Sequence, residues 1–246
     1  MKKLLLFFSV ICCSAIMYGQ NDTTLVLAGV QEPEQNEPLV FQSEAFSNDL
    51  ALFVETCSKY NNAKLKKWAQ DLNSHFTTDD NGAIHLEYVI NANHDFDIET
   101  IKTYAVGWFN VAFSGANAIT SMTDNSIAAT GRLVGIAQKT VNAIYYAKSI
   151  TVNADIDVVL RFKENRIKID TYIRHYQYIS GDSMMKGKND LITCGSVFPV
   201  VNDKTDDQVY ACAFINSLDH SFGKIKSFIE YMNKPAVNSD KSEEDW

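Results

Sequence analysis

The sequence predicts an α+β protein, in which an antiparallel sheet carries helices on one face and a further helical segment precedes the sheet. Two kinds of pattern support this class. Several stretches alternate apolar and polar side chains, as strands that bury one face do. Other stretches repeat apolar residues every three or four positions, as helices do. From residue 84 the order is strand, helix, four strands, an irregular excursion and a final helix.

The added helical segment is expected over residues 47–78. Leu50, Phe53 and Cys57 recur at helical spacing, and the same spacing resumes after Asn61. Two helices or one bent helix would both produce this pattern. The apolar face of the segment is expected to pack against the rest of the protein.

The α+β domain is expected over residues 79–235 and opens with a turn followed by a strand. The Asp-Asp-Asn-Gly stretch 79–82 predicts the turn, because Asn-Gly tolerates a positive φ. Residues 84–90 then alternate, with four apolar side chains on one face and His85 and Glu87 on the other. This pattern predicts a strand with one buried face.

The helix that follows has clear boundaries in the sequence. Asp97 is the predicted N-cap, and Phe96 before it is expected to pack onto Ile101. The apolar stripe continues through Trp108, and Gly115 offers a left-handed cap at the end.

A first hairpin is predicted from residues 118–122 and 126–137. A polar turn separates the two strands, and Gly131 and Gly135 mark bends or a close approach of the backbone.

A second, longer hairpin joins residues 152–162 to residues 167–173 through a turn at Glu164-Asn165. Both strands alternate throughout, so one face of this hairpin is apolar and the other is polar. Residues 182–207 are irregular, and a final helix carries an apolar stripe from Phe214 to Met232.

The ends of the chain are expected to lie outside this fold. Residues 1–20 are predicted to be a signal peptide, because two lysines precede an apolar run that is too short to span a bilayer. Cleavage is expected at about residue 19 or 20. Residues 21–46 are a polar leader interrupted by prolines, and residues 236–246 are predicted to be a disordered acidic tail.

The signal predicts an exported protein that is periplasmic or associated with the outer membrane, with no transmembrane segment after cleavage. A lipoprotein is the less favoured alternative. Cys12 follows Val10 and Ile11 rather than the small residues that lipid attachment needs.

The charge of the chain makes nucleic acid and anionic lipid poor partners. The formal net charge is −8, and removal of Lys2 and Lys3 with the signal would leave −10.

Three cysteines remain after the predicted cleavage: Cys57, Cys194 and Cys212. In an oxidising compartment Cys194 and Cys212 are the most plausible disulfide pair. The alternative, in which all three are reduced and buried, fits the sequence equally well. No Cys-x-x-Cys and no cluster of cysteine and histidine occurs, so structural zinc is not predicted.

No motif in the sequence predicts catalysis, a cofactor or a metal. The five histidines show no pairing that would place two ligands on one face. Asp155 and Asp157 share a strand face, which would suit glycoside hydrolysis only if that face lined a cleft. A solvated strand face is the favoured interpretation, and an enzyme is less favoured than a non-enzyme.

The candidate binding residues are Tyr172, Arg174, Tyr176 and Tyr178. Strict alternation would place them together on the polar face of the second hairpin. Aromatic side chains and arginine on a polar face are typical of recognition surfaces. Helices covering that face would instead make the tyrosines part of the core.

Parts of residues 80–178 resemble a family of exported bacterial domains of unknown function, number 4468, which has a TBP-like fold. The similar parts are the strand 84–90 with the helix through Trp108-Phe109, the glycine-marked segment 127–135, and the hairpin from Ala154 to Ile169. The resemblance implies a curved antiparallel sheet flanked by helices, made for export and without an established activity. It supplies no catalytic residues.

These observations favour a non-enzymatic envelope protein that binds an envelope protein or a small apolar ligand. Two alternatives remain open, a hydrolase acting on envelope polymers and a structural accessory of an envelope assembly. A binding module would expose aromatic side chains, a hydrolase would cluster carboxylates of raised pKa in a cleft, and an accessory would present a flat apolar patch.

Overall fold

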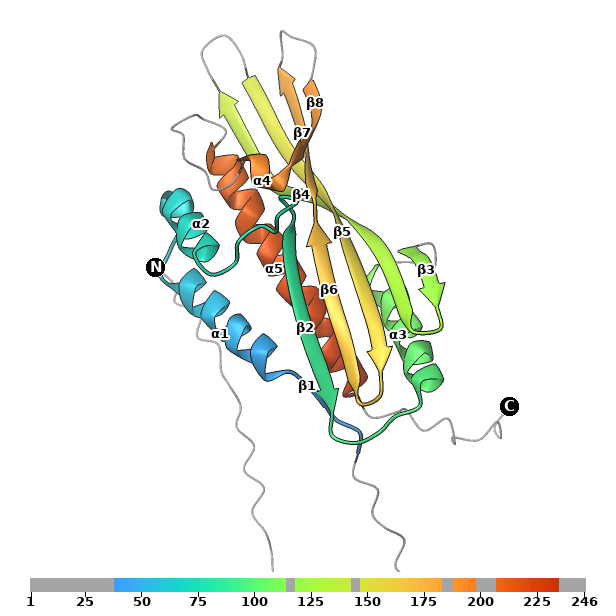
Figure 1. Ribbon diagram of the computed structural model, residues 1–246. Coiled ribbons are helices and arrows are strands. Elements are labelled where there is room, and N and C mark those ends of the chain that lie inside the picture. The colour runs from blue at the N-terminus through green and yellow to red at the C-terminus, as the bar shows by residue number, and fades with distance from the viewer. Residues whose placement is uncertain (1–37, 114–117, 143–146, 183–187, 198–206, 235–246) are drawn as a thin grey trace, which may run out of the picture. The chain divides into compact units, whose positions relative to one another are not determined.

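A computed structural model describes residues 38–113, 118–142, 147–182, 188–197 and 207–234 (Figure 1). Within them the predicted α+β class is confirmed, since a curved antiparallel sheet carries helices on one face. The predicted signal peptide 1–20, the leader up to residue 37, the cap at Gly115 and the acidic tail 236–246 lie outside the described residues.

The described residues form one sheet of eight strands, and every pairing in it is antiparallel. The strands are β1 (Phe41–Gln42), β2 (Ile84–Ala92), β3 (Ile119–Thr123), β4 (Ser126–Asn142), β5 (Ala147–Lys163), β6 (Arg166–Ile173), β7 (His175–Asp182) and β8 (Lys188–Thr193). Their spatial order is β1-β2-β6-β5-β4-β3, and β7 lies between β5 and β8.

The long strand β5 organises this sheet. One of its edges pairs with β4 from end to end. Its other edge is shared, because residues 157–163 pair with β6 and residues 148–154 pair with β7. Both strands of the β4–β5 hairpin extend further than predicted. Their outer pairs mix polar and apolar residues, as in Thr140 with Ser149 and Lys139 with Ile150, so the apolar alternation of the inner part does not continue clearly.

The two glycines of β4 behave as predicted. A Cβ on Gly131 would lie 2.3 Å from Cδ1 of Phe113, so only glycine lets that ring pack against the strand. Gly135 has a φ of +65° and lies where the register with β5 shifts, between Leu133 and Ala137. The bend in β4 is therefore a β-bulge built on a left-handed glycine.

The helices are α1 (Glu44–Ser58), α2 (Leu65–Asn73), α3 (Ile98–Ala112), α4 (Cys194–Val197) and α5 (Asp207–Met232), with a 3-10 turn at Asn62–Lys64. The view in Figure 1 places α3 and α5 behind the sheet. Asp97 caps α3 as predicted, accepting hydrogen bonds from the backbone of Glu99 and Thr100. Helix α1 begins three residues earlier than predicted, because Ser43 caps it by accepting from Phe46 N.

An aromatic cluster joins the first helices to the rest of the fold. The ring of Phe222 in α5 lies 4.9 to 6.5 Å, between centroids, from four other rings. They belong to Phe46 and Phe53 of α1, Phe76 after α2, and Tyr88 of β2. The helical segment predicted at residues 47–78 is thus part of the main core.

None of the helices in the described part of the chain is long and apolar enough to cross a membrane.

Candidate functional site

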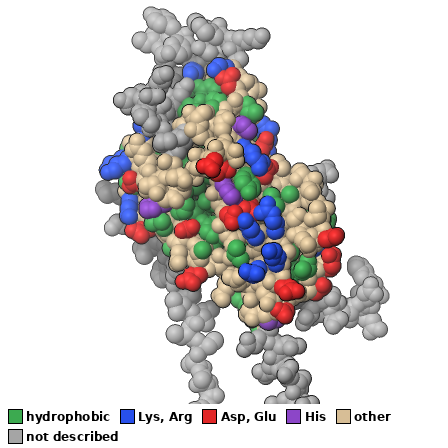
Figure 2. All heavy atoms as spheres, viewed as in Figure 1, with side chains coloured by type: hydrophobic (Ala, Val, Ile, Leu, Met, Phe, Trp, Pro, Cys, Tyr) green, Lys and Arg blue, Asp and Glu red, His purple; other side chains and the backbone are tan. Residues whose placement is uncertain are grey.

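The face of the sheet turned away from the helices is open along β2, β6 and β5. Figure 2 shows this face, where lysine and arginine side chains gather beside acidic and histidine side chains. The register places His85 of β2 opposite Tyr172 of β6, and Glu87 opposite Asp170. The polar side chains of two strands that are far apart in the sequence therefore meet on this face.

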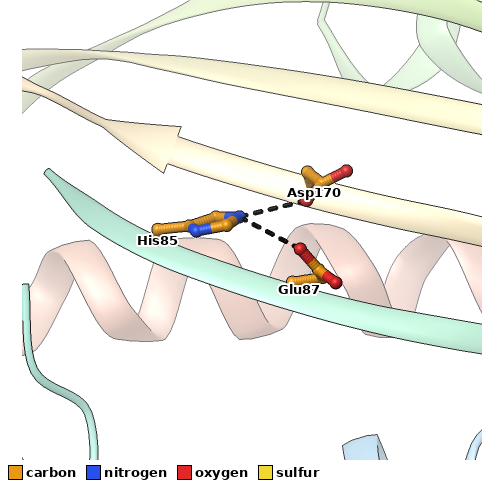
Figure 3. Close-up of side chains that lie close together, drawn as sticks. All are labelled: His85, Glu87 and Asp170. Carbon is orange, nitrogen blue, oxygen red and sulfur yellow. Dashed lines mark hydrogen bonds and ion pairs between the residues drawn. The ribbon is translucent and has the colours of Figure 1, made fainter. Parts of the chain in front are cut away.

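Asp170 is the centre of this arrangement. Its side chain has no exposed surface although it lies on the open face, because neighbouring side chains cover it. His85 Nε2 lies 3.0 Å from Asp170 Oδ1 (Figure 3). Arg161 pairs with Asp170 Oδ2. A carboxylate can only accept a hydrogen bond, so Nε2 carries the proton. These partners compensate the cost of burying the charge.

Glu87 forms a second ion pair beside the first. Lys168 Nζ lies 2.7 Å from Glu87 Oε1. The hydrogen bond from Lys168 lowers the pKa of Glu87, and the same bond raises the pKa of Lys168. The two groups are therefore both charged across the neutral pH range.

One ligand atom from each of His85, Glu87 and Asp170 lies within 4.8 Å of the others, which is close enough for a shared metal ion. Each carboxylate, however, already pairs with a cation, Lys168 for Glu87 and Arg161 for Asp170. A metal ion would have to displace both cations or sit beside them, so this arrangement favours ion pairing over metal binding.

Stacked rings and a further ion pair extend the arrangement from β2 and β6 towards β5. The Tyr172 and His85 rings lie 4.2 Å apart, between centroids, at an angle of 11°. Arg174 Cζ lies 5.0 Å from the centroid of the Tyr172 ring, and the Arg174 guanidinium pairs with Asp157. Burial, followed by the nearby charge of Asp170, raises the pKa of Tyr172. Contacts between side chains thus run without a break across β2, β6 and β5.

A basic groove lies next to this arrangement. It encloses about 530 Å³ and is lined by Val89, Arg161, Lys163, Arg166 and Lys168. Two pairs of like charge face each other across the β5–β6 hairpin, Arg161 with Lys168 and Lys163 with Arg166. We call these five residues the basic groove.

The prediction that the four candidate binding residues share one exposed face is wrong. Tyr172 and Arg174 lie on the open face, but Tyr176 is completely buried and Tyr178 is 4% exposed. Arg174 and His175 are both exposed, which interrupts the alternation between β6 and β7 and turns the later tyrosines towards the helices. Tyr176 then shares a hydrogen bond of 3.1 Å with Ser217 of α5.

The predicted disulfide between Cys194 and Cys212 is absent, and Cys57, Cys194 and Cys212 are all free thiols. The alternative with three reduced cysteines describes the structure better, although only Cys194 is fully buried. Cys194 begins α4, where its amide donates to the Arg174 carbonyl at 3.0 Å.

Asp155 and Asp157 both line a hollow of about 440 Å³, as the hydrolase alternative requires, but the carboxyl pKa values that are displaced are not raised. Among the carboxyl groups in the described part of the chain, the pKa values of Glu55, Glu87 and Asp97 are displaced, and hydrogen bonds lower all three. Asp157 is held by Arg174 and by Thr130 Oγ1 at 2.7 Å, while Asp155 is exposed.

Sequence reasoning missed the basic groove, although a signal for it was present. The two-residue turn at Glu164-Asn165 fixes the register of the hairpin on either side of it. It therefore sets Lys163 against Arg166, and Arg161 against Lys168.

The fold and site together define an α+β domain with one face of its sheet covered by helices and one face polar and open. No family model and no curated protein matches the chain. The chain is similar to one solved structure, a TBP-like protein from Parabacteroides distasonis, with 12% identity and a TM-score of 0.41. The match covers 63% of this chain and 98% of that one.

This likeness is too slight to transfer any property from that protein to this chain. Membership of family number 4468 stays a prediction.

Proposed function

We propose that this chain is a non-enzymatic binding module of the bacterial cell envelope, and that it holds its ligand on the open face of β2, β6 and β5. The observation that carries this proposal is the fixed arrangement around Asp170. A buried carboxylate on an open sheet face adds little to stability, because the cost of desolvation offsets the attraction of its partners. Exposed ion pairs add little as well. Such an arrangement is better explained as a surface held ready for a ligand.

The stacked rings give this surface its rigidity. His85, Tyr172 and Arg174 support one another through the ring stack and the guanidinium contact. Their side chains lose little freedom when a ligand binds, which lowers the entropic cost of binding. Two of the four binding residues predicted from the sequence, Tyr172 and Arg174, belong to this surface.

Native mass spectrometry of the protein purified gently from its own envelope tests this proposal. We expect the wild type to carry additional mass of ligand or partner size, and the Tyr172→Ala variant to lose it. The control is Tyr104→Ala, which removes a tyrosine that is 42% exposed on α3 and should keep the additional mass. A bare wild-type chain, or equal loss from both variants, would contradict the proposal.

Export is the second part of the proposal, and it rests on residues 1–20. Cleavage there would leave Gln20 or Asn21 as the first residue of the exported chain. Cell fractionation followed by N-terminal sequencing checks this. An intact N-terminus in the cytoplasmic fraction would contradict export and leave the proposed binding surface untouched.

A further inference from the structure

The basic groove combines side chains that a folded protein ordinarily keeps apart. Like charges directly opposite each other on neighbouring strands destabilise a sheet. Arg161 faces Lys168 in this way, and Lys163 faces Arg166 two residues nearer the turn. The formal net charge of the whole chain is −8, so this concentration of cations is local.

The two pairs differ in how they are neutralised. Asp170 pairs with Arg161, and Glu87 pairs with Lys168. Lys163 and Arg166 have no acidic partner among the described residues, and Glu164 in the turn between them forms no ion pair there either. The groove therefore holds two positive charges for which the described residues provide no counterion.

The residues that line the groove suit an anion. Val89 is 42% exposed and provides an apolar contact beside the four cations. Arginine and lysine both bind phosphate oxygens, arginine through two parallel hydrogen bonds and lysine as a compact charge. A phosphate group presents more oxygen acceptors than a carboxylate, so it can contact cations from both strands at once.

We infer that the basic groove binds a ligand bearing phosphate groups, with Lys163 and Arg166 as its principal contacts. This inference rests on the proposed function and names the ligand class for the open face. A doubly charged phosphate would supply the two missing negative charges and relieve the repulsion between the cross-strand cations. Arg161 and Lys168 are already paired with Asp170 and Glu87, so these two cations line the groove and are not its principal contacts with the ligand.

Isothermal titration of the purified chain with sodium pyrophosphate at low ionic strength tests the inference. We expect saturable binding that weakens as sodium chloride is added, because exposed charges are screened by salt. The double variant K163Q/R166Q should bind at least about tenfold more weakly. Neither residue has an ion-pair partner among the described residues, and the variant removes a repulsion between opposed cations, so it should unfold at the same temperature as the wild type or slightly above it.

The matched control is K64Q/K67Q, which removes the same charge from exposed positions in the 3-10 turn and α2. It should keep its affinity for pyrophosphate within about twofold, because direct hydrogen bonds from Lys163 and Arg166 are expected to provide most of the binding. Equal weakening in both double variants would show a general charge effect and overturn the inference. So would an absence of pyrophosphate binding to the wild type, or tighter binding of a single-stranded oligonucleotide through Lys163 and Arg166.

A second arm distinguishes free phosphates from lipid headgroups. Binding to vesicles of phosphatidylglycerol but not of phosphatidylcholine, lost in K163Q/R166Q, would assign the site to a headgroup. Pyrophosphate binding without vesicle binding would assign it to a soluble phosphate, and both results support the inference. If additional mass is seen by native mass spectrometry but survives in K163Q/R166Q, the inference fails while the proposed binding function stands.

Discussion

Cys194 is the most protected of the three thiols in the described structure. It is fully buried, and burial raises the pKa of its thiol to about 12. Burial also raises the pKa of Cys57 and Cys212, but both of these side chains remain partly exposed. Only the thiolate is a nucleophile, so the three cysteines should differ widely in reactivity.

Alkylation with iodoacetamide at pH 8 should therefore modify Cys57 and Cys212 before Cys194. With a pKa of about 12, on the order of one Cys194 thiol in ten thousand is ionised at that pH. Peptide mass mapping against time measures the order. After unfolding in guanidinium without reductant, all three should react. Protection of Cys194 and Cys212 together in the unfolded protein would instead reveal the disulfide.

The sequence could predict which side chains of β2 and β6 face away from the core, but not how they meet. Alternation alone placed His85 and Glu87 on the open face. Their contacts with Asp170 depend on the pairing of β2 with β6, which are separated by more than seventy residues. Long-range pairing of this kind leaves no local signal, so the centre of the site could not be recognised from spacing.

Strand β4 packs closely against the Phe113 ring because Gly131 has no side chain. Gly131 lies against the Phe113 ring, which in turn packs on Trp108 with centroids 6.0 Å apart. Lys224 of α5 lies 4.4 Å from the centroid of the same ring. The position of Phe113 is therefore fixed from three sides.

The Gly131→Ala variant should lose about 1 to 3 kcal/mol of unfolding free energy, because the new Cβ would overlap the Phe113 ring. Gly223→Ala is the matched control. A Cβ there would meet nothing within 4 Å, and alanine in a helix should add up to about 1 kcal/mol. Urea unfolding monitored by circular dichroism measures both. Equal stability of the two variants would contradict the packing of Phe113 on β4.

Among the elements, those with strong periodicity were predicted and those without it were missed. The capped helix at Asp97, the two hairpins and the final helix are all confirmed. Strand β8 (Lys188–Thr193) was missed because its sequence does not alternate, and it is defined by hydrogen bonding to β7. The start of α1 was misplaced because the cap Ser43 lies in a stretch whose polarity resembles the leader.

At the scale of the whole molecule, the described residues between 38 and 234 share one core. Phe222 contacts rings from α1, from the segment after α2 and from β2, while Trp108 of α3 packs on Phe228 of α5. The boundary predicted between residues 78 and 79 therefore does not separate two cores. The sequence shows two helical apolar faces but does not show that they meet on α5.

We expect the Phe222→Ala variant to lose about 3 to 5 kcal/mol, since it removes the ring that connects these elements. Unfolding should remain one transition, with coincident curves from far-ultraviolet circular dichroism and tryptophan fluorescence. Phe222→Leu, which keeps most of the volume, should lose less. Separate unfolding of the α1–α2 region in the wild type would contradict a shared core.

Arg174 and His175 are consecutive exposed residues, so the alternation of buried and exposed side chains shifts by one position between β6 and β7. Before this shift, the side chains on the open face have even numbers, and after it the exposed ones have odd numbers. Loss of a single residue there would exchange inside for outside along all of β7 and drive two tyrosines out of the core. The number of residues in this junction therefore decides which side chains of β7 face the helices.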